Sequence, residues 1–233
     1  MAKSIIGFHY SIGGNKSGIG AFMETLNQHG IPFLMKGVDD AGLCFEGQTK
    51  GQAHGVQNHL IYRVSTAGQH QNGAQNVEYD VPDYTKSPIS AAQEHFDKTA
   101  AKWPQELNKS IVWMEPINEP RAKLSPGDVQ FENMHPVDWL GAFMLEYAKI
   151  ANAQGFKVCG PSFNSGEPEV FGPEGQNNDY ELPGMLAYLQ YCADNPEKAA
   201  LSVHEYTWNR WTFGESWPNW YPTLWGRVEA AIA

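Results

Sequence analysis

The chain has 233 residues and a formal net charge of −10 at pH 7, from 16 Lys and Arg against 26 Asp and Glu. This length suffices for one large α/β domain with a sizeable core. The acidic balance excludes the two partner classes that bind through clustered cations, namely nucleic acid and anionic membrane surfaces. A neutral substrate fits the composition best.

The three cysteines, Cys44, Cys159 and Cys192, are widely spaced and form no CxxC motif or Cys/His cluster. This indicates neither a disulfide framework nor a zinc site, and we expect no metal and no organic cofactor. The N-terminal MAKSIIGFHYS has no signal-peptide pattern, and no segment approaches a membrane span. The chain is therefore expected to be soluble, and cytoplasmic by default.

Six short apolar runs recur along the chain and are predicted as strands. Each run is nearly continuous rather than alternating, which is typical of strands that are covered on both faces in a parallel sheet. The runs are SIIGFHY (4–10), IPFLMKGV (31–38), HLIYRVS (59–65), SIVWMEPI (110–117), FKVCGPS (156–162) and ALSVHEY (200–206).

Helical patterns lie between these runs. Ser17 is predicted to cap a helix that continues through Leu26 and ends at Gly30, and the Gly-rich segment 41–57 is predicted as a second helix. A capping box formed by Ser90 and Gln93 starts the third.

Prolines mark the start of two further helices. Pro136 suits a first helical turn, and the pattern that follows it ends at Gly155. Apolar residues recur there at helical spacing: Val137, Leu140, Met144, Tyr147, Ala148 and Ala151. Pro183 opens the last helix.

Strict alternation of strand and helix predicts a parallel α/β sheet. Long loops follow the strands, at 67–88, 121–134, 164–180 and 207–220, whereas the turns after helices are short. This is typical of a TIM (β/α)8-type barrel whose site lies at the carboxyl ends of the strands. We predict one barrel domain over residues 1–233. An open doubly wound sheet is the alternative, but SIGGNKSGIG departs from the GxGxxG dinucleotide fingerprint.

The fourth run leads directly into two carboxylates enclosed by prolines, in SIVWMEPINEP (110–120). Here Asn118-Glu119-Pro120 resembles the fourth-strand signature of the retaining (β/α)8 glycoside hydrolases, which include cellulases, mannanases, xylosidases and β-glucanases. Glu115 matches a carboxylate that these enzymes often carry four positions earlier. At the end of the sixth run, His204-x-Tyr206 is similar to their His-x-Tyr. The resemblance implies hydrolysis of a β-linked polysaccharide or oligosaccharide.

The resemblance also implies residue roles. Glu119 would be the general acid/base, and Asn118 would hold a sugar hydroxyl beside it. His204 and Tyr206 would orient the nucleophile and the sugar ring. A glutamate near a second carboxylate at the mouth of an apolar barrel is expected to have a raised pKa, as an acid catalyst needs. His9, near the end of the first run, is a candidate wall residue of the site.

Aromatic residues crowd together after the sixth run. They are Trp208, Trp211, Phe213, Trp217, Trp220, Tyr221 and Trp225. Indole faces stack on the apolar C–H faces of sugar rings, so this segment suits a glycan groove. We expect Trp208 and Trp211 to contact substrate, and Trp225 to pack against the barrel.

The glycosidase nucleophile of the resembled family is a glutamate at the end of a seventh strand, which this chain does not reach. About six βα units are present, and a full barrel has ~250 residues. We therefore predict a fragment whose nucleophile lies beyond Ala233, and which would be inactive if that residue is missing; a fold that departs from the family is the other explanation. Open barrel edges would favour self-association.

Other interpretations of these motifs stay open. Glu119 could be a turn residue, and His204 a buried core histidine. In function, the rivals are a non-catalytic carbohydrate-binding barrel and a barrel enzyme of unrelated chemistry.

Overall fold

The computed structural model describes residues 7–65, 78–164 and 182–204, in which six strands alternate with five α-helices. The strands are β1 (Gly7–Ser11), β2 (Leu34–Val38), β3 (His59–Arg63), β4 (Val112–Met114), β5 (Lys157–Phe163) and β6 (Ala199–Val203). The helices are α1 (Ile19–Gln28), α2 (Gly42–His54), α3 (Pro88–Ala100), α4 (Pro136–Ala153) and α5 (Leu182–Asp194), and a short 3-10 helix, η1 (Phe131–Asn133), precedes α4.

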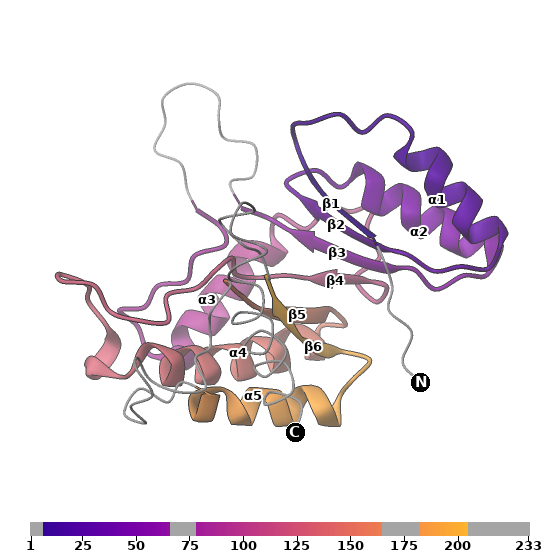
Figure 1. Cartoon of the computed structure of the whole chain (residues 1–233). Coiled ribbons are helices and arrows are strands. Elements are labelled where there is room, and N and C mark those ends of the chain that lie inside the picture. Colours follow the sequence, from indigo (N-terminus) through magenta and orange to yellow (C-terminus); the bar gives the residue numbers. More distant parts are fainter. Residues whose placement is uncertain (1–6, 66–77, 165–181, 205–233) are drawn as a thin grey trace, which may run out of the picture.

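The strands form one sheet in which every pairing is parallel and the spatial order follows the chain, from β1 to β6. Each predicted apolar run contains or overlaps one of these strands, so the parallel α/β prediction is confirmed. In Figure 1, α1 and α2 run beside β1–β3, and α4 and α5 run beside β5 and β6. β1 and β6 are the outer strands of the described sheet.

Two helix starts differ from their predictions. The N-cap of α3 is Ser87, three residues before the predicted cap Ser90, because Ser87 Oγ accepts the Ser90 N–H at 3.3 Å and Pro88 occupies the first turn. Helix α1 has Gly18 rather than Ser17 at its cap, with φ of 83°, a left-handed conformation that glycine adopts without strain.

The helices pack on one face of the sheet. Side chains on that face, such as Met35, Leu60 and Val158, are fully buried among helix residues. Helices α4 and α5 meet at backbone contact, because a Cβ on Gly141 would overlap the carbonyl of Gly184. The other face carries Trp113, which is half-buried and lines an open cavity.

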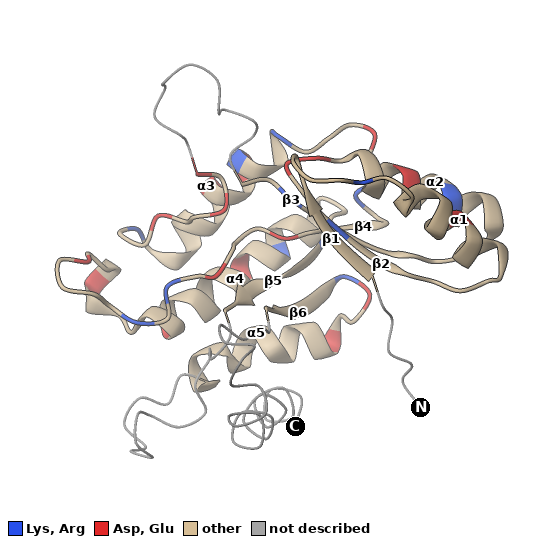
Figure 2. Cartoon of the chain, turned by 45° about the horizontal axis from the view of Figure 1, so that its top comes forward, with Lys and Arg blue, Asp and Glu red and all other residues tan. Residues whose placement is uncertain are grey.

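Charged residues of both signs are interspersed along the described chain (Figure 2). None of the described helices is both long enough and apolar enough to cross a lipid bilayer.

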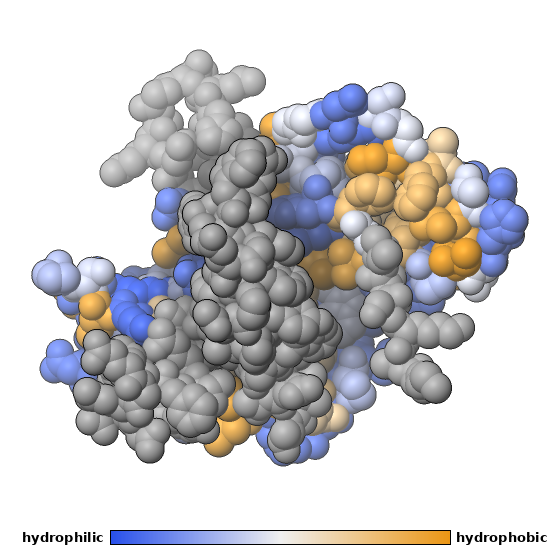
Figure 3. Space-filling view, viewed as in Figure 1, coloured by the Kyte–Doolittle hydropathy of each residue, from blue (hydrophilic) through white to orange (hydrophobic). Residues whose placement is uncertain are grey.

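Apolar side chains gather on the surface over β1 and α1, at the outer edge of the sheet (Figure 3). Phe8, Ile12 and Phe22 are 38%, 56% and 45% exposed. The rings of Phe8 and Phe22 meet edge to face, with centroids 5.4 Å apart. We call these three residues the β1–α1 patch.

Candidate functional site

The strand β4 is followed by Glu115 and Glu119 because a proline between them ends its pairing in the sheet. The N–H of Glu115 still donates to the Tyr62 carbonyl of β3, at 3.0 Å. Pro116 has no N–H, so the ladder cannot continue beyond it. Its carbonyl instead accepts a hydrogen bond from Nε2 of His95 on α3, at 2.8 Å. Burial lowers the pKa of His95 to about 3, which keeps the ring neutral.

The next residues carry the chain back to the end of the sheet. Ile117 is buried in the helix-side core, and the Glu119 N–H donates to the Ser162 carbonyl near the end of β5, at 3.0 Å. Glu119 has φ of 43°, which is uncommon for a residue other than glycine. Such backbone strain persists where the surroundings hold it, and it is frequent at functional sites.

Glu119 projects its carboxylate from this turn toward His204, at the end of β6. Its Oε1 lies 3.3 Å from His204 Nδ1, and 35% of the Glu119 side chain is exposed. The structure therefore brings together two of the predicted site residues that lie 85 positions apart in the sequence.

Glu115, rather than Glu119, is the desolvated carboxylate, since its side chain is fully inaccessible. Its two oxygens lie 2.8 and 2.7 Å from Lys36 Nζ, and Arg63 lies at 3.3 Å. The hydroxyl of Ser162 donates to the same carboxylate, and His204 Nε2 lies 3.4 Å away. Two cations thus hold Glu115 in its ionised form.

Arg63 connects this buried pair to Asn118. The guanidinium donates to Asn118 Oδ1, and its Nε lies 3.4 Å from Asp80 Oδ2. Burial raises the pKa of Asp80, while the charge of Arg63 opposes that shift. Because Asn118 Oδ1 accepts from Arg63, the amide presents Nδ2 as its donor.

His9 lies opposite Lys36 in the pairing of β1 with β2. Partial burial, followed by the charges of Lys36 and Arg63, lowers the pKa of His9. The structure therefore places His9 beside the same charged cluster.

A cavity of about 550 Å³ opens on the sheet face away from the helices, and both Lys36 and His204 line it. The rest of its wall is largely apolar, with Leu34, Ile61, Trp113, Leu201 and Val203. This volume falls within the range of small-molecule sites.

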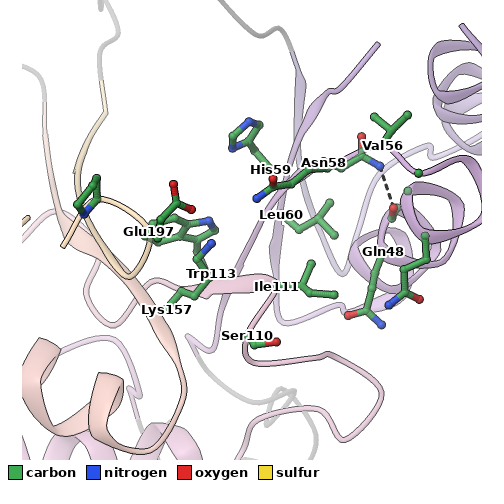
Figure 4. A pocket seen from close by; sticks show the side chains of 16 residues that line it. Gln48, Val56, Asn58, His59, Leu60, Ser110, Ile111, Trp113, Lys157 and Glu197 are labelled. Atoms are coloured by element: carbon green, nitrogen blue, oxygen red, sulfur yellow. Dashed lines mark hydrogen bonds between the residues drawn. The ribbon is translucent and has the colours of Figure 1, made fainter. Parts of the chain in front are cut away.

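A second cavity of similar volume lies toward the amino ends of the strands (Figure 4). It shares His59 and Trp113 with the first cavity but contains neither Glu115 nor Glu119. The ammonium of Lys157 sits 4.4 Å from the centre of the Trp113 ring. The first cavity also lacks Glu115 and Glu119 in its wall, but it borders the charged cluster through Lys36 and His204, which the second cavity does not reach.

Three predicted substrate contacts, Tyr206, Trp208 and Trp211, lie outside the described residues. In the described part of the chain, no group of three or more His, Cys, Asp and Glu side chains is placed to hold a metal ion.

Sequence reasoning did not assign Lys36, Arg63 or Ser162 to the site. A usable signal was present for Lys36, because a lysine inside an apolar strand needs a buried acidic partner. Glu115, at the end of the fourth apolar run, was the carboxylate that could have been predicted as the partner of Lys36. Ser162 gave no such signal.

Acid is expected to weaken the fold through Glu115. Burial raises the pKa of Glu115, but the charges of Lys36 and Arg63 and the hydrogen bond from Lys36 oppose this effect, and the pKa falls from 4.5 to about 2. A carboxyl group whose pKa is lower in the folded state than in the unfolded state stabilises the fold fully at pH values above the unfolded-state pKa. This contribution is lost as the pH falls through the folded-state pKa.

We therefore expect the difference in unfolding free energy between wild type and E115Q to shrink by on the order of 3 kcal/mol from pH ~5 to pH ~2. Urea denaturation at a series of pH values measures this difference. A constant difference across the window would contradict the ion pairing of Glu115.

No protein-family model, curated protein or solved structure matches this chain.

Proposed function

We propose that the protein is a β-glycoside hydrolase of the retaining type, acting on a neutral β-linked polysaccharide or oligosaccharide. The observation that carries this proposal is the contact of Glu119, in the Asn-Glu-Pro turn after β4, with His204 at the end of β6. Both residues lie at the carboxyl end of a parallel sheet, where α/β enzymes place their catalytic groups.

The proposed scaffold is a (β/α)8-type barrel. Six parallel strands in sequential order, with their helices on one face, support this architecture. The cavity on the opposite face corresponds to the inside of such a barrel.

In the proposed reaction Glu119 protonates the departing glycosidic oxygen and later removes a proton from the attacking water. Its exposed carboxylate can reach a bound sugar. Asn118 Nδ2 is oriented to donate to a hydroxyl of that sugar. Glu115 is unsuited to attack the sugar, because it is fully inaccessible and bound by Lys36 and Ser162. The proposal assigns the nucleophile to a residue outside the described ranges.

Turnover and binding, measured on the same preparation, test this function. The chain is incubated with β-glucan, β-mannan, β-xylan and aryl β-glycosides, reducing ends are quantified, and binding is measured by calorimetry. NMR of the first product should show retained anomeric configuration. Inverted product would refute the retaining mechanism. Binding without turnover, even of aryl β-glycosides supplied with azide or formate as an external nucleophile, would favour a carbohydrate-binding protein. A metal or phosphate requirement would favour unrelated chemistry.

We further propose that the chain self-associates through the edge of its sheet. The outer strand β1 carries the β1–α1 patch, and exposed apolar edges are sites of association. Sedimentation velocity over a range of concentrations should show wild-type oligomers that F22E dissociates. The matched control is I89E, which alters an exposed apolar residue on α3. A monomeric wild type, or equal effects of the two variants, would contradict the proposal.

A further inference from the structure

The ring of His204 lies between an ammonium and a carboxylate. Its Nε2 is 2.7 Å from Lys36 Nζ, and its Nδ1 is 3.3 Å from Glu119 Oε1. A lysine ammonium has three hydrogens to donate and accepts none. At this distance Nε2 must therefore be the acceptor, and the hydrogen of a neutral ring lies on Nδ1.

Lys36 is fixed in its ammonium form by the ion pair with Glu115. Both Glu115 oxygens are within 2.8 Å of Lys36 Nζ, and only 10% of the Lys36 side chain is exposed. This lysine belongs to β2, whereas Glu115 and Glu119 follow β4. The ion pair with Glu115 therefore holds the ammonium of Lys36, which projects from β2, against the ring of His204.

The competing arrangement is a hydrogen on Nε2 that points to Glu115 Oε1, 3.4 Å away. That oxygen is already contacted by Lys36, Arg63 and Ser162. An imidazolium would carry hydrogens on both ring nitrogens, so its Nε2–H would face the Lys36 ammonium at 2.7 Å, one donor against another. The neutral Nδ1–H form avoids both problems.

We propose that Lys36 is a positioning residue that holds His204 as the neutral Nδ1–H tautomer, so that His204 donates to Oε1 of Glu119. Resting on the proposed function, this assigns the two oxygens of Glu119 different roles. Oε1 accepts from His204 in both the ionised and the protonated carboxyl, so the transferable proton is carried by Oε2. His204 thereby orients the catalytic proton without losing its own.

Nitrogen NMR of the histidine rings tests this directly, without substrate. Long-range ¹H–¹⁵N spectra of protein labelled with ¹⁵N-histidine distinguish a protonated from an unprotonated ring nitrogen. The chain has eight histidines, and the cross-peaks that are missing from the spectrum of H204Q identify the ring nitrogens of His204. We expect a protonated Nδ1 and a bare Nε2 in the wild type. K36M should move the hydrogen to Nε2, and K36R, which keeps a cationic donor, should retain the wild-type pattern.

A wild-type protein with its hydrogen on Nε2, or a K36M pattern identical to wild type, would overturn the proposal. If K36M fails to fold, K36R provides the test, because a hydrogen on Nε2 of His204 in K36R would also overturn the proposal. The spectra require no turnover. A chain without glycosidase activity can therefore still confirm the tautomer, and an active chain can still refute it.

Discussion

Glu119→Gln is expected to slow hydrolysis of a β-linked oligosaccharide by about 10²- to 10⁴-fold, the usual contribution of a general acid/base. Glutamine keeps the shape of the side chain and its acceptor toward His204 Nδ1, but it has no proton to transfer. Sugar binding should change little. The loss should be smaller for an aryl β-glycoside with an acidic phenol, because such a leaving group departs without protonation.

The matched control is E106Q, at an exposed glutamate in the turn before β4 that lies toward the opposite end of the strands. Rates with both substrate types, together with calorimetric binding, separate the possibilities. Equal losses for the two leaving groups would indicate a structural rather than an acid/base role for Glu119. Unchanged turnover in E119Q would remove it from the mechanism.

The sheet could be predicted from the sequence because its strands are apolar on the helix-covered face and carry further apolar side chains, such as Ile61 and Trp113, on the cavity face. Such strands appear as continuous apolar runs, and strict alternation with helical patterns implies parallel pairing. The exact start of α3 was not predictable in the same way. Ser87 and Ser90 are both good caps, and the choice of Ser87 depends on Pro88 and on the docking of His95 against Pro116.

The candidate site was predictable only in part, for a physical reason. Glu119 and His204 lie at strand ends, where a polar residue after an apolar run stands out. The pairing of Lys36 with Glu115 joins residues 79 positions apart, and no local pattern encodes such a contact. The same limit applies to Arg63 and Asn118, whose contact depends on how the loops after β3 and β4 approach each other.

The buried pair carries the largest expected effect on stability. Glu115→Ala is expected to lower the free energy of unfolding by about 3–5 kcal/mol, the cost of leaving a buried charge without its partner. Lys36 would lose its carboxylate, and Arg63 would keep only Asp80 as an ionic partner among its described contacts. Urea denaturation with linear extrapolation measures the change.

E106A, at the exposed glutamate before β4, provides the matched control and should leave the unfolding midpoint close to wild type. A double-mutant cycle with K36M then measures the interaction energy between Lys36 and Glu115. In the K36M background, removal of Glu115 no longer leaves the Lys36 ammonium buried without its carboxylate. The two changes should therefore cost less together than the sum of their separate costs. Strictly additive costs, or an E115A variant as stable as the control, would show that the ion pair is exposed to water in solution. In that case the ammonium would also be free to leave the ring of His204.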